Sequence, residues 1–218
     1  MSGGNIMVCL LMMALSAAVV IMIMPILIPI LHDLKFGQTV RDDGPKEHLK
    51  KMGTPTMGGL AFIFSAAIFS LMYAHMDERI LALILVIVGF GAIGFIDDYI
   101  KIKKKRKDGL YPSQKMFGLI LVAVAFAMYI LRTGMDTKIM IPFLDNVTVD
   151  LYYFYVPIAV LVLISTTNAV NLTDGLDGLA SGIGVIVMLF FALVAAKSLD
   201  CVYIVVFCAT GIGGLLGF

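Results

Sequence analysis

The sequence contains few charged residues, few histidines and few cysteines, and each shortage argues against a class of protein. Charged residues make up 14% of the chain and hydrophobic residues 61%, which lies far outside the composition of soluble globular domains. The three histidines are scattered and no pair has metal-ligand spacing, which argues against a zinc enzyme. The three cysteines lie in apolar segments without the close spacing of a thiolate metal site, so we interpret them as packing residues.

The sequence also shows no long internal repeat and no flexible linker. Without a long repeat or a proline-rich or serine-rich linker, residues 1–218 are predicted to form a single integral-membrane domain. The first apolar segment has no basic leader and continues through Pro25 and Pro29, so we expect it to be retained as a helix. Each proline removes a backbone donor and crowds the preceding turn, which should bend the second half of this helix.

What the chain does contain is a series of long apolar segments. Seven of them approach or exceed the roughly 17 to 25 residues that cross a hydrocarbon core of about 30 Å. Each is expected to be a helix, because a lone strand would leave backbone groups unpaired in lipid. The sequence thus predicts an all-α polytopic transmembrane bundle of about seven spans. The spans are Asn5 to Leu31, Met57 to Tyr73, Ile80 to Ile96, Met116 to Leu131, Tyr153 to Thr166, Leu179 to Ala196 and Cys201 to Phe218.

Basic residues are distributed unevenly among the connections. Residues 32–56 contain five and residues 97–115 contain seven, together twelve of the sixteen in the chain. Because short cytoplasmic loops carry the excess of Lys and Arg, both connections are predicted to face the cytoplasm, with the N-terminus outside. Alternation then places residues 167–178 and Phe218 on the cytoplasmic side as well. On the outer side, two extended segments flank Asp145-Asn146 and suggest a small hairpin between spans four and five.

The first polar cluster on the predicted cytoplasmic side is Asp97-Asp98, at the end of the third span. Lys101 follows four and three residues later, within helical reach of both carboxylates. Adjacent carboxylates raise each other's proton affinity unless a cation neutralises them, which favours a divalent-metal or proton-transfer site. The structural alternative is a pair of solvated charges at a helix end, with Lys101 extending to the membrane surface.

The second cluster lies between spans five and six and comprises Asn168, Asn171, Asp174 and Asp177. Asp-Gly repeats at a spacing of three residues, which suits a tight turn or a broken helix. Polar groups between long apolar runs are costly unless function uses them. Helix capping is the alternative, with Asp177 accepting amide hydrogen bonds at the start of span six. Capping accounts for one Asp but not for the whole cluster.

The third cluster is the segment Lys50 to Gly59, which leads into the second span. Its lysines, threonines and glycines offer cations, hydroxyls and free backbone amides that can hold phosphate oxygens. A basic loop flanking the membrane is the alternative, and the spacing is not that of a nucleotide-triphosphate P-loop. Carboxylates, amides and cations on one face together favour phosphoryl transfer to a lipid-soluble substrate with Mg²⁺, which prefers oxygen ligands.

These motifs resemble a known superfamily. Thr54-Pro-Thr-Met-Gly-Gly59, Asp97-Asp98-Tyr-Ile-Lys101 and the block from Asn168 to Gly178 are similar to motifs of the polyprenyl-phosphate N-acetylhexosamine-1-phosphate transferases. The first string is more characteristic of the phospho-N-acetylmuramoyl-pentapeptide transferases. This resemblance implies transfer of phospho-MurNAc-pentapeptide from its UDP carrier to undecaprenyl phosphate, giving lipid I and UMP in peptidoglycan biosynthesis. It also implies a multi-pass bacterial plasma-membrane protein with a cytoplasmic active site, and a homodimer, without a nucleic-acid partner.

The resemblance further implies roles for individual residues. Asp97 would deprotonate the lipid phosphate, or assist a covalent Asp nucleophile in a two-step scheme, and Asp98 would help to orient or bind at the same site. Asn171, Asp174 and Asp177 would line the uridine diphosphate and metal region. The catalytic candidates are Asp97, Asp98 and Asp174, and the substrate and phosphate-binding candidates are Lys51, Thr56, Lys101, Lys115, Asn168, Asn171 and Asp177.

One departure from the family pattern concerns the metal. Members of the family continue with a further cytoplasmic Asp that ligates Mg²⁺, so the main ligand is expected beyond Phe218 and no metal ligand is assigned here. The 218-residue chain is accordingly expected to be inactive alone or to be one piece of a longer protein. Two alternative functions stay open. One is transfer of N-acetylglucosamine phosphate to a polyprenyl phosphate, and the other is a transporter or channel, which would place acidic groups in mid-span.

Overall fold

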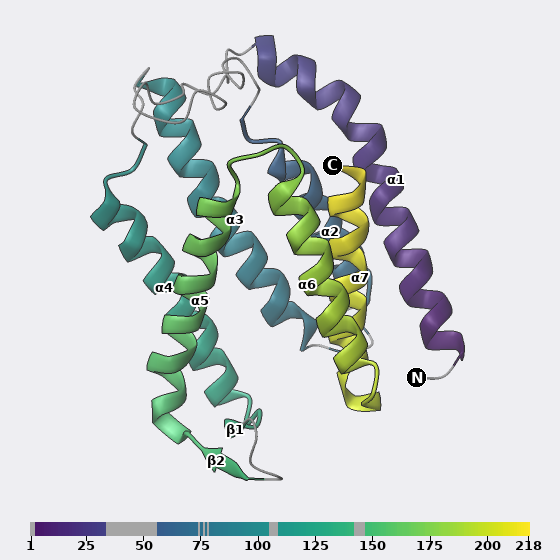
Figure 1. Cartoon of the computed structure of the whole chain (residues 1–218), viewed down its shortest axis with the longest axis vertical. Coiled ribbons are helices and arrows are strands. Elements are labelled where there is room, and N and C mark those ends of the chain that lie inside the picture. The colour runs from purple at the N-terminus through teal and green to yellow at the C-terminus, as the bar shows by residue number, and fades with distance from the viewer. Residues whose placement is uncertain are drawn as a thin grey trace.

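The computed structural model describes residues 3–33, 56–73, 75, 77, 79–104, 109–141 and 147–218. Within these ranges the chain forms seven α-helices and one two-stranded antiparallel sheet (Figure 1). The helices are α1 (Gly3–Asp33), α2 (Gly59–Tyr73), α3 (Ile80–Lys103), α4 (Pro112–Arg132), α5 (Tyr155–Thr173), α6 (Leu179–Ala195) and α7 (Val202–Gly217). The strands are β1 (Lys138–Met140) and β2 (Thr148–Asp150), and the 3₁₀ turns are η2 (Tyr152–Phe154) and η3 (Leu199–Cys201).

The helices coincide with the predicted apolar segments, and four of them are long and apolar enough to cross a membrane. These are α1, α3, α4 and the continuous stretch Tyr152–Thr173. The other three, α2, α6 and α7, have 15 to 17 residues. At 1.5 Å per residue they are about 23 to 26 Å long, slightly shorter than a hydrocarbon core of about 30 Å. The predicted class, a helical membrane protein, is therefore confirmed, whereas the number of spans and their orientation stay predictions.

Two helices extend past the ends predicted for them. The third span was expected to end at Ile96, but α3 continues to Lys103, so Asp97 and Asp98 lie within the helix. The fifth was expected to end at Thr166, but α5 continues to Thr173 and includes Asn168 and Asn171. Hydropathy marks where apolar residues stop, whereas a helix continues as long as its backbone hydrogen bonds are made. The turn predicted from the two Asp-Gly pairs is confirmed at residues 174–178, between α5 and α6.

Helix α1 contains both Pro25 and Pro29 and remains a single helix of 31 residues. Its ribbon changes direction in the C-terminal third, as the prolines predict (Figure 1).

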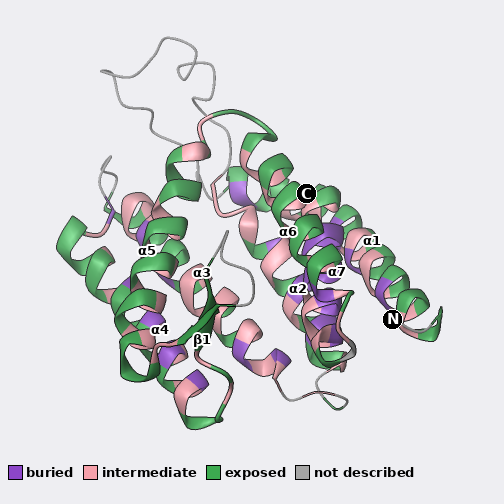
Figure 2. Cartoon of the chain, turned by 60° about the horizontal axis from the view of Figure 1, so that its bottom comes forward, coloured by how far each residue is buried: buried purple, intermediate pink, exposed green. Residues whose placement is uncertain are grey.

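Helix α7 forms the centre of one half of the molecule, where it packs against α1, α6 and α2. Ten of its sixteen residues are buried, which Figure 2 shows as a dark stripe among largely exposed helices. Close approach depends on small residues, since a Cβ atom added at Gly213 would collide with the Met13 carbonyl oxygen of α1. The hydroxyl of Ser16 donates to the Thr210 carbonyl at 2.7 Å, and that of Ser65 donates to the Ser16 carbonyl at 3.0 Å.

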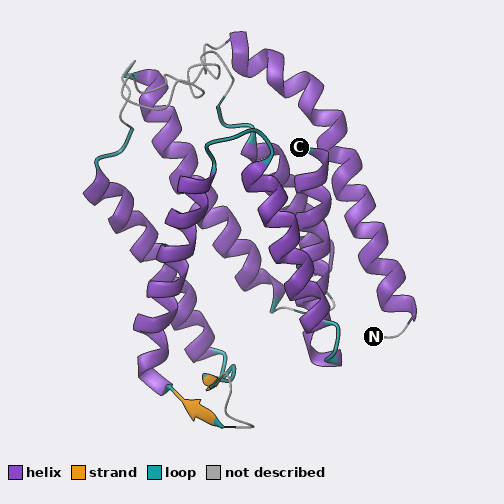
Figure 3. Ribbon diagram, in the orientation of Figure 1, coloured by secondary structure: helices purple, strands orange, loops and turns teal. Residues whose placement is uncertain are grey.

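The other half of the molecule is built on α3, α4 and α5, with α4 packing against both neighbours. A Cβ atom at Gly89 would lie 2.9 Å from Val122, so α3 and α4 approach closely. None of the residues of α5 is buried within the described structure. Figure 1 places the end of α3, the start of α4 and the α5–α6 turn at one end of the bundle. The hairpin lies at the opposite end (Figure 3).

The hairpin was predicted from the extended segments between spans four and five, and it is confirmed. Its register pairs Lys138 with Asp150, Ile139 with Val149, and Met140 with Thr148. The backbone N–H of Ile141 donates to the Val147 carbonyl at 3.0 Å, which continues the pairing by one residue. The predicted turn at Asp145-Asn146 lies outside the described residues.

Candidate active site

Asp97 is the most enclosed carboxylate of the predicted cluster, with 7% of its surface exposed. It lies in the penultimate turn region of α3, on the same helical face as Lys101. The Lys101 ammonium contacts Asp97 Oδ2 at 2.9 Å and also donates to Asp98 Oδ1 at 2.9 Å. A single cation therefore bridges both carboxylates, as the spacing of four and three residues predicted.

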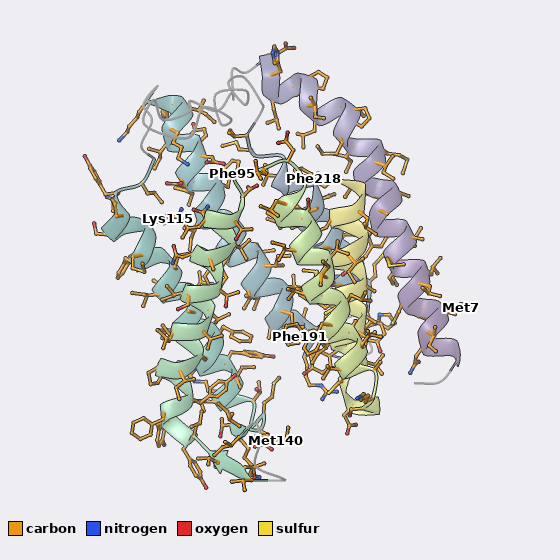
Figure 4. The ribbon with its side chains drawn as sticks, in the orientation of Figure 1. Met7, Phe95, Lys115, Met140, Phe191 and Phe218 are labelled. Carbon is orange, nitrogen blue, oxygen red and sulfur yellow. The ribbon has the colours of Figure 1, made fainter. Side chains whose placement is uncertain are left out.

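A second cation reaches Asp97 from the neighbouring helix. Lys115 lies in the first turn of α4, and its Nζ is 3.8 Å from Asp97 Oδ2. Figure 4 labels Lys115 at the end of the bundle where α3 ends. Opposite charges at this distance favour the ionised carboxylate. The side chains of Lys101 and Lys115 are 35% and 28% exposed, so both ammonium groups can also contact a ligand from solution.

The chain just before α4 closes over Asp97 from the other side. The backbone N–H of Leu110 donates to Asp97 Oδ1 at 2.8 Å. Gly109 is buried, and a Cβ atom added there would approach both Asp97 Oδ1 and the Asp97 backbone oxygen closer than van der Waals contact allows. Asp97 is thus held by one backbone donor and two lysines, with one oxygen turned toward each kind of partner. Isolated, solvated charges at a helix end would not require this arrangement.

Gly109 and Leu110 were not among the predicted site residues. The sequence signal around them is only a glycine shortly before Pro112, which begins α4 at a position where helices commonly have proline. Such a signal predicts a helix start, but it cannot reveal that the preceding backbone contacts a carboxylate thirteen residues earlier. That contact depends on the packing of α4 on α3.

The second cluster is divided between a helix and a turn. Asn168 is half-buried in α5, and its side-chain amide donates to the Ile164 carbonyl at 2.9 Å. Asn171 is exposed one turn later, and Asp174 ends the helix with its carboxylate exposed. Within the described residues, the Asp174 side chain has no hydrogen-bond or ion-pair partner. An exposed carboxylate of this kind is available to a ligand.

The start of α6 bears on the capping interpretation of Asp177. Gly178 occupies the N-cap position with φ 76°, a left-handed conformation that residues with a Cβ atom adopt at a cost. Asp177 precedes the cap and is exposed. The N–H of Gly182 donates to the Gly178 carbonyl at 2.8 Å, so the helix starts on backbone hydrogen bonds. The glycine that follows Asp177 therefore sets the turn.

The third cluster is described only in part. Thr56 is half-buried and lies three residues before α2, whereas Lys51 and the preceding lysines lie outside the described residues. Gly58 packs beside the Phe218 ring, and the rings of Phe62 and Phe218 have centroids 6.1 Å apart. The entrance of α2 is thus fixed against the end of α7, at the same end of the bundle as the Asp97 site (Figure 4).

The described residues contain no group of three or more His, Cys, Asp or Glu side chains arranged to hold a metal ion. Asp97 and Asp98 are two hard oxygen donors, but both are engaged by Lys101. Asp174 is exposed and without a partner among the described residues, so it suits an ion that takes one carboxylate and completes its shell with phosphate oxygens and water. Magnesium has this preference.

Comparison with known proteins gives two family matches. Residues 80–218 match the family described as Glycosyl transferase family 4. Residues 51–63 match the phospho-N-acetylmuramoyl-pentapeptide-transferase signature 1. The first match covers α3 to α7, including the Asp97 site and the second cluster, and the second covers the entrance of α2.

Relatives with the name phospho-N-acetylmuramoyl-pentapeptide-transferase are similar over most of the chain. The protein of Acetivibrio thermocellus is 57% identical over 205 residues, which are 94% of this chain and 62% of the relative. Those of Caldanaerobacter subterraneus subsp. tengcongensis and Halalkalibacterium halodurans are 47% and 43% identical, covering 88% and 97% of this chain. They are covered over 60% and 66% of their own lengths. The chain thus spans about three fifths of the length of these relatives.

Proposed function

Because the chain belongs to glycosyl transferase family 4, we propose that it takes part in phosphoglycosyl transfer to a membrane lipid. The substrates proposed are UDP-MurNAc-pentapeptide and undecaprenyl phosphate, and the products are lipid I and UMP. The match to signature 1 and the names of the relatives favour these substrates over UDP-GlcNAc. A homodimer is proposed on the family resemblance alone.

The observation that carries the proposal is the environment of Asp97. This carboxylate is nearly buried, yet it lies between the ammonium groups of Lys101 and Lys115 and accepts a hydrogen bond from Leu110. The two lysines form an anion site that the carboxylates occupy while no substrate is bound. A phosphate group carries more charge than a carboxylate, so a bound lipid phosphate competes with Asp97 and Asp98 for both lysines.

This competition gives Asp97 its chemical role. When the lysines contact the phosphate, Asp97 loses its nearest cations and its Oδ2 becomes free to accept a proton from the lipid phosphate. A phosphate oxygen of that lipid then attacks the sugar-linked phosphorus of the nucleotide, and the bond to the UMP oxygen breaks. One pyrophosphate linkage is formed as another is lost, so no external energy source is required. Most of the rate enhancement comes from charge neutralisation and alignment.

The second cluster is proposed to bind the nucleotide. Asn171 and Asp174 are exposed beside the α5–α6 turn, at the same end of the bundle as Asp97 (Figure 1). Asn168 and Asp177 flank them, and Thr56 with Lys51 would contact phosphates from the entrance of α2. Mg²⁺ is proposed to be held by the nucleotide diphosphate and by the carboxylate of Asp174, where it would neutralise charge on the phosphates.

The membrane arrangement is also part of the proposal. Seven spans with the N-terminus outside would place the site at the cytoplasmic face of the bacterial plasma membrane, where a soluble nucleotide meets a lipid phosphate. The carboxylates at this end of the bundle favour an enzyme over a transporter, for which acidic groups in mid-span are typical.

The proposal is tested by measuring substrate binding with the chain in lipid nanodiscs, and UMP release with a chimera in which residues 1–218 are continued by the rest of the Acetivibrio thermocellus relative. Undecaprenyl phosphate and UDP-MurNAc-pentapeptide should each bind, and UDP-GlcNAc should bind at least tenfold more weakly. Asp97→Asn should abolish UMP release while both affinities stay within about threefold, because it removes a proton acceptor and keeps the shape. Asp136→Asn, an exposed carboxylate beside Lys138, is the matched control. Binding of neither substrate would refute the proposal, and turnover by the chain would refute the expectation that it is inactive alone.

A further inference from the structure

In the described part of the hairpin, one face carries four neighbouring apolar side chains. Side chains alternate between the two faces of a strand, so residues 139 and 141 share a face with their cross-strand partners 149 and 147. The apolar hairpin face therefore consists of Ile139, Ile141, Val147 and Val149. Each of these side chains is 37–44% exposed.

The opposite face of the hairpin is mostly polar. It carries Lys138, Met140, Thr148 and Asp150, and Lys138 also contacts Asp136 at 3.9 Å. The hairpin is thus amphipathic, with polar groups on one side and four β-branched side chains on the other. A two-stranded hairpin with an uncovered apolar face is at best marginally stable in water.

Exposed aromatic residues continue from the hairpin into α5. Tyr152, Tyr153 and Phe154 are 68%, 85% and 74% exposed. The Asp150 carboxylate accepts hydrogen bonds from the Thr137 hydroxyl at 2.5 Å and from the Tyr152 backbone N–H at 3.1 Å, which fixes the junction. Tyr152 adopts φ 45°, an uncommon conformation for a bulky residue. The fold therefore holds these rings outward at a cost in backbone strain.

The position of the hairpin determines which partner its apolar face can reach. Five residues separate the end of α4 from β1, and even fully extended they span at most about 18 Å. On the other side, β2 is followed almost directly by η2 and α5. The hairpin therefore cannot move far from the end of these apolar helices (Figure 3). Tyrosine is enriched at the membrane–water interface, where the ends of spanning helices lie, because one end of its side chain is apolar and the other polar.

We propose that the apolar hairpin face and Tyr152 to Phe154 insert into the bilayer boundary at the end of the bundle opposite Asp97, as an interfacial anchor. The partner is the lipid surface itself. The polar face of the hairpin then faces water. This anchor is separate from phosphoglycosyl transfer, because it involves none of the proposed site residues and lies at the other end of α3 to α5 (Figure 4).

The test uses the absence of tryptophan from the chain, which makes any introduced Trp the only one. Val149→Trp places the probe on the apolar face, and Thr148→Trp, one residue away on the polar face, is the matched control. Both proteins are reconstituted in phosphatidylcholine vesicles, and the emission is quenched with lipids brominated near the headgroup or with aqueous acrylamide. The brominated lipid should quench Val149→Trp at least threefold more strongly than it quenches Thr148→Trp. Acrylamide should quench Thr148→Trp more strongly than Val149→Trp.

A conservative variant covers the case in which a hairpin substitution prevents folding. Tyr153→Trp replaces one exposed aromatic ring with another and should show the same preference for lipid quenching. Equal quenching of all probes by acrylamide, without lipid quenching, would overturn the proposal. A blue-shifted emission that neither agent quenches would also overturn it, because another part of the protein would then cover the face. A blue shift that disappears when the protein is diluted in lipid would do the same, because a second copy would then cover the face. No substrate enters the assay, so its outcome is independent of the proposed function.

Discussion

Asp97 is buried in α3 and contacts two lysines and one backbone donor. These partners come from α3 itself, from the segment before α4 and from α4. Lys101 could be predicted from helical spacing, and Lys115 was predicted as a phosphate contact from the family resemblance. Neither the 3.8 Å approach of Lys115 nor the Leu110 hydrogen bond follows from sequence spacing. At the scale of residues, the sequence therefore identified the charged groups but not the backbone that holds them.

The lysine nearest to Asp97 on α4 should be needed for lipid-phosphate binding. Lys115→Met removes the charge and keeps most of the apolar stem. We expect the dissociation constant for undecaprenyl phosphate to rise roughly tenfold, which corresponds to about 1.4 kcal/mol. Lys138→Met, at the other end of the molecule, serves as the control. Equal affinities of all three proteins in nanodiscs would contradict a phosphate-binding role for Lys115.

Gly109 should tolerate no side chain, because an added Cβ atom would meet Asp97. In the chimera that continues residues 1–218 with the rest of the Acetivibrio thermocellus relative, Gly109→Ala is expected to displace the Leu110 N–H from Asp97 and to lower UMP release at least tenfold, with little change in nucleotide affinity. Gly94→Ala in α3 is the matched control, since no atom lies within 4 Å of the position of its Cβ. The kinetics and the thermal midpoint should be measured together. If Gly109→Ala lowers the thermal midpoint and the rate of UMP release falls no further than the loss of folded protein explains, the role of Gly109 is purely structural.

At the scale of elements, apolar length predicted every helix in the described ranges, but not where the polar ends of α3 and α5 stop. Within α5, the Asn168 side-chain amide donates to the Ile164 carbonyl four residues earlier, a partner that no hydropathy pattern encodes. The hairpin was predicted from two extended segments around a turn-forming pair, and only its register revealed that four apolar side chains share a face.

The stability of the junction between the hairpin and α5 should depend on pH. Hydrogen bonds from the Thr137 hydroxyl and from the Tyr152 N–H hold the pKa of Asp150 below its usual value of about 3.9. A lowered native pKa means that this interaction stabilises the fold above the usual pKa and is lost as the pH falls through the native pKa. Thr137→Val should therefore shift the pKa of Asp150 upward in a carboxyl ¹³C NMR titration, whereas Thr133→Val should not. An unchanged titration in Thr137→Val would show that the hydroxyl is not the cause.

The contact between α7 and α1 should be sensitive to a single methyl group. Gly213→Ala places a Cβ atom against the Met13 carbonyl, and overpacking of this kind typically costs about 1 to 3 kcal/mol. The thermal midpoint in detergent should fall, as measured by circular dichroism. Gly182→Ala in α6 has open space at the same atom and should keep or slightly raise the midpoint. Equal midpoints for both variants would mean that α1 can move away at little cost.

At the scale of the whole molecule, the helices alternate in direction and bring the described residues of three polar clusters to one end. The hairpin and its aromatic residues are left at the other (Figure 1). One end of the bundle is therefore charged and accessible to ligands, and the other end carries the amphipathic hairpin that we propose contacts lipid. This separation follows from connectivity, since an even number of spans separates each pair of clusters.

The predicted orientation can be tested on intact cells. In a chain whose three cysteines are replaced, Lys197→Cys and Lys104→Cys introduce thiols at exposed positions on opposite ends of the bundle. A membrane-impermeant maleimide should label Lys197→Cys directly and Lys104→Cys only after the cells are opened. The reverse pattern would place the N-terminus in the cytoplasm and remove the Asp97 site from the cytoplasmic face.

The sequence by itself determined the class of protein, the helices and the residues that carry charge, because hydropathy and short-range spacing are local properties of the chain. It also predicted the hairpin and indicated a family. Only the tertiary structure decided that Gly109 and Leu110 close over Asp97, that Lys115 reaches it from α4, and that α7 forms the buried centre. These features depend on how helices pack, and packing is set by contacts between residues far apart in the chain, which no local pattern records.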